Sequence, residues 1–188
     1  MNSNEAWSRF INYFQANEIP CHQIVDDFAP QLVMTFYNQN EAPNNCVEGT
    51  LFFYDGCIEA RVYYDAAGQK WCRESEHKHE LMRLFNYINA RVFVMAKDGA
   101  GNALFDPQFL YDPRLYMTED GNFDITLTFV IPYKFYELAP LETETFYADI
   151  CPKLLNDLAL PIFFLLLGEW TIEQSINFID YQLLSKNQ

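Results

Sequence analysis

The side chains best suited to metal chemistry lie together in residues 72–80. Cys72, His77 and His79 would offer Zn²⁺ a thiolate and two imidazoles, which are ligands that this ion prefers. On a helix, however, the two histidines point about 200° apart, because neighbours on one helix face are three or four residues apart. The acidic and basic residues around them are typical of a solvated helix start. We therefore expect a charged helix start here and no metal site.

The other reactive side chains lack the spacing that catalysis needs. Cys21 is followed by His22, and Cys57 could pair only with a distant histidine, but adjacency along the chain does not produce the geometry of a nucleophile and its base. Asp106 and Asp112 do not match the pattern of a calcium loop. The glycines of residues 98–102 lack the Lys-Ser/Thr that follows a phosphate loop. The sequence thus indicates neither an enzyme nor a cofactor.

The net charge of the chain bears on which kinds of partner it can bind. The chain carries 26 acidic and 12 basic side chains, a formal net charge of -14, which would repel a phosphate backbone or an anionic membrane surface. The most apolar run, residues 158–168, is shorter than the roughly 20 residues that a bilayer-spanning helix needs. We expect neither nucleic acid nor membrane as a partner. Five cysteines without a CxxC motif and a polar start favour a reducing cytoplasm over secretion.

Hydrophobic periodicity separates the helices from the strands. Alternating apolar and polar residues predict strands with one face in the core and a more polar face outside, apolar residues three and four apart predict helices, and Asp55-Gly56 predicts a tight hairpin turn. The predicted order is a helix at residues 5–17, a strand at 31–38, a hairpin within 47–65, a helix after Ser75, and strands at 91–97, 114–118 and 123–131. C-terminal helices follow, which Pro152 and Pro161 divide into short pieces, and Thr171 and Gln174 match a capping box that begins the last of them. Residues 98–113 form a long excursion from the core. We expect one α+β domain over residues 1–188, with a mainly antiparallel sheet of about six strands.

This layout resembles a known family. The segment LxxLFNxINAR at residues 81–91, the hairpin and the closing helix after GEWTIEQSINFID at 168–180 resemble the YbjN family of bacterial proteins, whose fold is similar to that of type III secretion chaperones. The resemblance covers residues 5–184 in layout and implies helices packed on one face of the sheet, frequent dimerisation and a regulatory or chaperone-like role without catalysis. The excursion is longer than the turn expected there. No functional residue is carried over, because the family has no established catalytic motif.

Two groups of apolar side chains are candidates for contacts with a partner. The first lies in and beside the excursion and comprises Phe105, Phe109, Tyr111 and Tyr116. These aromatics either pin the loop to the domain or form exposed anchors for a protein partner. The second lies in a run without a polar face and comprises Ile162, Phe163, Phe164, Leu165 and Leu166. Such a helix packs against its own core or against another subunit, and the second alternative predicts a homodimer.

Two amides, Asn86 and Asn89, lie among the apolar residues of the helix predicted before residue 91. On a helical wheel Asn89 falls within the apolar arc and Asn86 at its margin. A buried amide left unpaired costs about 1–3 kcal/mol, so we expect the Asn89 side chain to donate to a carbonyl of the turn into residues 91–94. We interpret both as structural polar residues, with Asn89 fixing the helix on the sheet.

These observations favour a non-enzymatic protein-interaction or regulatory protein. It would bind a protein or peptide through the aromatic excursion or an exposed edge of the sheet. The alternative is a small-molecule-binding protein or hydrolase with a pocket lined by Tyr, Asn and Asp residues. A deep pocket with converging ionisable groups would favour that alternative.

Overall fold

The computed structural model describes residues 1–25, 29–92 and 110–184. Its centre is a six-stranded sheet in the order β1-β2-β3-β4-β6-β5, in which every neighbouring pair is antiparallel. The strands are β1 (Cys21–Ile24), β2 (Gln31–Tyr37), β3 (Cys46–Phe53), β4 (Cys57–Tyr64), β5 (Arg114–Met117) and β6 (Ile125–Pro132). The predicted α+β class with a mainly antiparallel sheet is confirmed.

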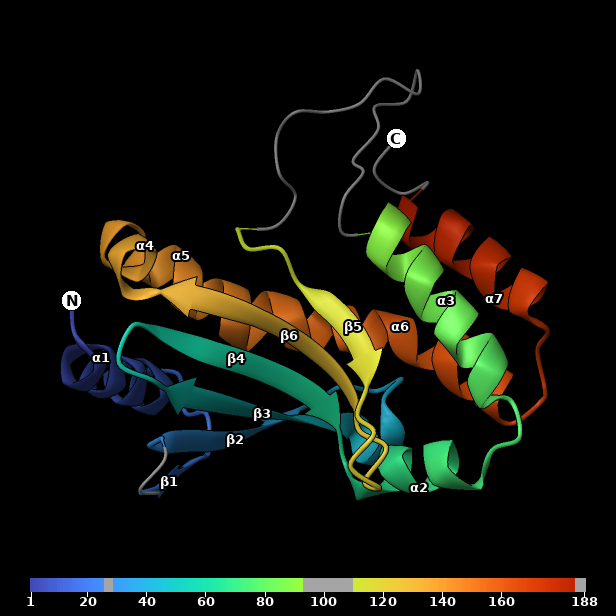
Figure 1. Ribbon diagram of the computed structural model, residues 1–188, viewed down its shortest axis with the longest axis horizontal. Helices are drawn as coiled ribbons and strands as arrows, with labels where there is room; N and C mark the ends of the chain where they lie inside the picture. The colour runs from blue at the N-terminus through green and yellow to red at the C-terminus, as the bar shows by residue number, and fades with distance from the viewer. Residues whose placement is uncertain (26–28, 93–109, 185–188) are drawn as a thin grey trace, which may run out of the picture.

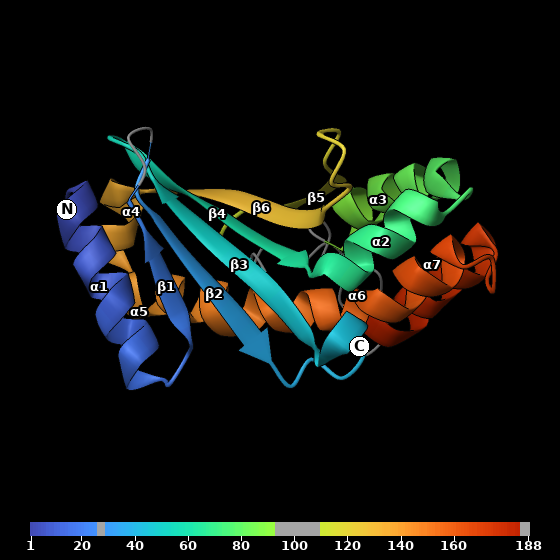
Figure 2. The same cartoon turned by 90° about the horizontal axis from the view of Figure 1, so that it is seen from below.

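The helices gather on one face and at one end of this sheet. Figure 1 looks onto the face that no described helix covers, and α1, α5 and α6 lie behind the strands, as the view from below in Figure 2 also shows. The helical elements are α1 (Ser3–Ala16), η1 (Pro43–Asn45), α2 (Ala66–Glu74), α3 (Lys78–Arg91), α4 (Tyr133–Leu138), α5 (Pro140–Thr145), η2 (Phe146–Ile150), α6 (Cys151–Leu166), α7 (Ile172–Ile179) and η3 (Asp180–Leu184).

The core lies between the sheet and α1, η2 and α6, because alternate residues of each central strand point toward these helices. In β4 the residues Ile58, Ala60 and Val62 are completely buried. Gly49 of β3 is required for close packing, since a Cβ there would lie 2.5 Å from the hydroxyl of Tyr147. That hydroxyl reaches the sheet, where it lies 2.8 Å from the sulfur of Met34 and 3.3 Å from the carbonyl oxygen of Arg61.

Several details differ from the sequence-based predictions. Residues 66–74 form the helix α2, which was not predicted, and Ser75 ends α2, whereas α3 begins only at Lys78. Arg91 ends α3 and does not begin a strand, and the remainder of the predicted strand at residues 91–97 lies mostly outside the described residues. β1 was not predicted, because its four residues are too few to show an alternating pattern. Pro152 and Pro161 do not divide the C-terminal region. Pro152 directly follows η2, a π-helical turn whose Phe146 carbonyl accepts from the N–H of Cys151, and the helical backbone runs from η2 into α6 without a break. α6 then continues through Pro161.

Pro161 is tolerated because α6 is held by its neighbours. The buried Ser175 hydroxyl of α7 donates to the carbonyl of Pro161 at 3.0 Å, which fixes α7 against the middle of α6.

Among the described residues, no helix has the length and apolar character needed to cross a membrane.

Candidate functional site

Most of the residues predicted for a subunit interface are buried within the chain itself. Ile162, Leu165 and Leu166 are at most 3% exposed, because β4, α2, α3 and α7 of the same chain surround this helix. Their burial supports the other alternative for an all-apolar segment, packing against the chain's own core. These residues therefore provide no surface for a second subunit. Phe163 and Phe164 have a different position, since both line a groove along the outer side of α6.

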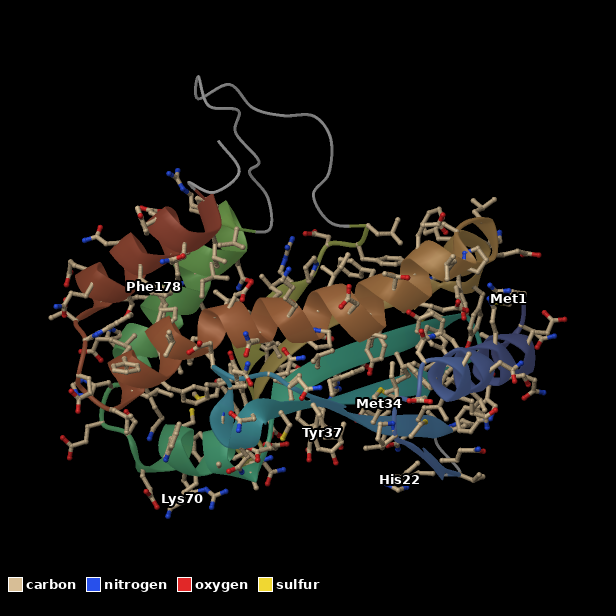
Figure 3. All side chains as sticks on the ribbon, turned by 180° about the vertical axis from the view of Figure 1, so that it is seen from behind. Met1, His22, Met34, Tyr37, Lys70 and Phe178 are labelled. Carbon is tan, nitrogen blue, oxygen red and sulfur yellow. The ribbon has the colours of Figure 1, made fainter. Side chains whose placement is uncertain are left out.

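This groove, the α6 groove, consists of two hollows of about 250 and 550 Å³ that share Glu41 and Leu160. Figure 3 looks onto this side of the molecule, with α6 across the centre and Phe178 labelled on α7. The smaller hollow is apolar and is lined chiefly by Ala42, Pro43, Trp71, Ala159, Leu160, Phe163, Phe164 and Leu167. The larger is lined by Glu41, Lys153, Asp157, Leu160, Phe178, Gln182 and Leu183.

One wall of the α6 groove is the connection between β2 and β3. The backbone N–H of Glu41 donates to the side-chain oxygen of Asn156 on α6 at 2.9 Å. The side chain of Asn44, whose φ of 53° is one that asparagine tolerates well, donates to the carboxylate of Asp65. Asp65 in turn caps α2 by accepting from the N–H of Ala67 at 3.0 Å. These contacts join the wall to both α6 and α2.

The opposite wall is formed by α7 and η3. Thr171 and Gln174 form a capping box that begins α7, as the sequence predicted. Ring contacts then connect α6 to α7 through Trp170, whose ring centroid is 5.0 Å from that of Phe164 and 5.3 Å from that of Phe178. The groove is thus bordered on both sides by elements with specific contacts to its floor.

The α6 groove combines an apolar floor with an acidic rim. Leu167 is 54% exposed and Trp71 is 37% exposed, and both line the smaller hollow. Among its described lining residues, Glu41 and Asp157 are acidic and Lys153 is basic. This arrangement suits an apolar group accompanied by positive charge.

A second concave surface lies on the open face of the sheet. It is a polar hollow of about 260 Å³, here called the sheet hollow, lined by Glu48, Thr50, Phe52, Arg61, Tyr63, Gln69, Thr118, Asp120, Asp124 and Thr126. Burial raises the pKa of the Glu48 carboxyl, and the negative charges of Asp65 and Asp124 raise it further. Burial also raises the pKa of the Asp124 carboxyl. Periodicity predicted that this face would be polar, but no sequence pattern connected these residues.

The candidate partner-binding aromatics do not form one surface. Phe105 and Phe109 lie outside the described residues. Tyr111 packs on the covered side, stacked on Phe129 with 5.4 Å between ring centroids, and its hydroxyl lies 2.8 Å from that of Thr143. Tyr111 therefore pins its segment to the domain, which was one of the two alternatives. Tyr116 is half-buried and lies beside Thr126 on the open face.

Asn89 holds α3 against the edge of the sheet. Its side-chain NH₂ donates to the carbonyl of Leu115 at 2.9 Å, and its side-chain oxygen accepts from the N–H of Leu115 at 2.8 Å. The amide thus occupies the place of a neighbouring strand at the β5 edge. We had predicted a partner in the turn after the helix, but the partner is Leu115 of β5. Asn86 is exposed and makes no comparable contact with the sheet.

Two of the residues considered for a metal site, Cys72 and His77, have other neighbours in the structure. The thiol of Cys72 is buried and donates to the sulfur of Met117 at 3.0 Å, and burial raises its pKa to about 11. His77 lies beside Gly168, and its ring nitrogen is 4.0 Å from the carboxylate of Glu80. Within the described part of the chain, no group of three or more His, Cys, Asp or Glu side chains is arranged to hold a metal ion.

Comparison with known proteins adds no relative. No family model matches the chain, and neither a curated protein nor a solved structure is similar to it.

Proposed function

We propose that this chain is a non-enzymatic protein-interaction protein whose α6 groove binds a peptide segment of a partner protein. The segment carries one or two large apolar anchors flanked by lysine or arginine. A regulatory or chaperone-like role, which the resemblance to the YbjN family implies, requires a surface of this kind.

The observation that carries the proposal is the exposed apolar lining of the groove. Trp71 and Leu167 are partly exposed at the smaller hollow, beside the half-buried Leu160 and Phe164. A pocket that takes a large apolar side chain from water provides most of the binding energy in many interfaces. Because the walls are joined to the floor by hydrogen bonds and ring contacts, a partner would lose little affinity to reorganisation of the groove.

Charge selects among apolar segments. The rim residues Glu41 and Asp157 and a formal net charge of -14 attract a basic partner and repel an acidic one. Electrostatic attraction of this kind accelerates association and excludes wrong partners more than it raises affinity. We therefore expect binding to weaken at high ionic strength, while the apolar anchor remains necessary.

Selection from a phage-displayed random peptide library against the immobilised protein tests this proposal. We expect enriched peptides with an aromatic or aliphatic anchor between basic residues. Fluorescence polarisation with the synthetic peptides should then show that Leu167→Lys weakens binding by about tenfold or more, because it fills the apolar hollow with a solvated charge. A lysine at the C-terminal end of a helix is electrostatically favourable, so the fold is retained.

Leu138→Lys is the matched control. Leu138 is 80% exposed at the end of α4 and does not line the groove. The substitution makes the same change of size and charge, so its effect on peptide affinity should stay within about twofold. Equal effects of the two variants, or a library without enriched peptides, would contradict the proposal.

A further inference from the structure

We infer that the sheet hollow is a second binding site, which takes a small organic cation carrying an ammonium or guanidinium group. The hollow lies on the open face of the sheet, whereas the α6 groove lies on the opposite, helix-covered side (Figures 1 and 3). This site is independent of the proposed peptide binding.

Strand register brings the central residues of the hollow together. Tyr63 pairs with Glu48 on β3 and with Thr126 on β6, so these three side chains form one row across three strands on the open face. Gln69 of α2 and the connection between β5 and β6, with Thr118, Asp120 and Asp124, enclose the row at its end. The result is a concave surface and not a flat strand face.

Thr126 supplies a polar side chain in this hollow that is buried but has no partner within the described chain. The residue is 2% exposed, yet among the described residues its hydroxyl has no hydrogen-bond partner. No described side-chain nitrogen or oxygen that is sealed from solvent is without a partner, so the Thr126 hydroxyl must open onto the hollow that it lines. The other buried polar side chains of the described chain are bonded, for example Thr50 to the hydroxyl of Tyr63 at 3.0 Å. A ligand donor would satisfy Thr126.

The charges around the hollow require a positive ligand. Glu48, Asp120 and Asp124 face it with one basic residue, Arg61. The Arg61 guanidinium is held by the carboxylate of Glu59 at 2.7 Å and lies 4.9 Å from the ring centroid of Phe52. Its charge is therefore largely compensated, and the carboxylates of the hollow retain a net negative potential. Burial raises the pKa of the Glu48 carboxyl, as expected for a group without a nearby cation.

Geometry favours an organic cation over a metal ion. The carboxylates lie on different strands and on a turn, and no described set of His, Cys, Asp or Glu side chains converges as a metal site would require. A guanidinium or alkylammonium group can instead donate to separate oxygens and lie against an aromatic ring such as Tyr63. A hollow of about 260 Å³ is close to the lower end of the usual range for small-molecule sites.

Titration of the protein with agmatine, followed by amide chemical shifts in two-dimensional NMR spectra, tests the inference. Agmatine carries both a guanidinium and an ammonium group. We expect saturable shifts centred on β3, β4 and β6, and weaker shifts with 4-guanidinobutyrate, whose carboxylate is repelled. An arginine side chain of another protein offers the same chemistry, and acetyl-Gly-Arg-Gly-amide serves as the probe for it. Tighter binding of either probe supports the site and identifies the source.

Three variants make the test specific. Glu48→Gln should weaken agmatine binding by about tenfold, and Thr126→Val should weaken it by about threefold. Glu119→Gln changes the net charge equally but does not line the hollow, so its effect should remain within about twofold. Non-saturable shifts, shifts centred on α6, or equal losses for Glu48→Gln and Glu119→Gln would overturn the inference. Unchanged peptide affinity of Glu48→Gln would show that the two sites are separate.

Discussion

The two faces of the sheet differ in what their side chains do. On the covered face, Ile58, Ala60 and Val62 are completely buried, and the buried Thr143 on helix α5 of that side is hydrogen-bonded. On the open face, Val130 is 53% exposed. The Thr126 hydroxyl opens onto the sheet hollow and has no hydrogen-bond partner among the described residues. The covered face carries the packing that stabilises the fold. The open face retains polar groups that a ligand could satisfy.

This difference shows why stability and binding can be tested separately. Core packing and paired polar groups contribute to the free energy of unfolding, and their removal leaves cavities or unpaired atoms. An unpaired hydroxyl at a hollow contributes little to folding, so its removal should affect ligand binding alone. The following substitutions test this distinction, in order of decreasing expected effect.

Phe163→Ala should have the largest effect. Phe163 is 4% exposed beneath the α6 groove, and its ring contacts Tyr64 and Trp71 with centroid distances of 4.7 and 5.2 Å. Truncation leaves a cavity under α6, and we expect the free energy of unfolding in urea to fall by about 3–5 kcal/mol. The control Phe135→Ala, at a residue 61% exposed on α4, should change it by less than about 0.5 kcal/mol. Similar losses for both variants would contradict the packing argument.

Asn89→Leu should have the next largest effect. It removes two hydrogen bonds to Leu115 and leaves an N–H and a carbonyl of β5 without these partners. We expect a loss of about 2 kcal/mol in the free energy of unfolding, together with faster hydrogen exchange of the Leu115 amide. Asn86→Leu makes the same substitution at an exposed position of α3 and should change stability by less than about 0.5 kcal/mol. Unaltered exchange at Leu115 would show that Asn89 does not hold this edge.

Thr143→Val and Thr126→Val compare the same change on the two sides of the molecule. The Thr143 hydroxyl lies 2.7 Å from the carbonyl of Ala139 and 2.8 Å from the Tyr111 hydroxyl, so its removal should cost about 1–2 kcal/mol. Thr126→Val removes no hydrogen bond within the described chain and should leave thermal stability within about 0.5 kcal/mol of the unsubstituted protein. A larger loss for Thr126→Val than for Thr143→Val would reverse the comparison.

The pH dependence of Glu48→Gln should be the smallest effect. Burial raises the pKa of the Glu48 carboxyl in the folded protein, so the folded state holds this proton more tightly than the unfolded chain does. The free energy of unfolding therefore falls as the pH rises from the unfolded-state pKa through the raised pKa, and the penalty is complete above it. In urea unfolding between about pH 4 and pH 7, the stability of Glu48→Gln relative to the unsubstituted protein should increase with pH. A pH-independent difference would show that Glu48 ionisation does not oppose folding.

Much of the fold was predictable because its causes are local. Alternation along β4 and β6 indicated which residues face inward, and the capping box at Thr171 indicated where α7 begins. Pro161 misled the prediction, because the packing of α6 against α7 and the core keeps a helix continuous where the local rule divides it. For Asn89 the role was predicted, but its partner lies 26 residues away on β5.

The candidate sites depend on contacts that no local pattern contains. The sequence by itself determined the acidic charge, the strand faces and the apolar character of residues 158–168, because these follow from composition and spacing. The tertiary structure alone decided that Ile162 and Leu165 are buried while Phe164 lines a groove, since this depends on which elements pack against α6. It also placed Glu48, Tyr63 and Thr126 in one row, because strand pairing joins residues that are distant along the chain.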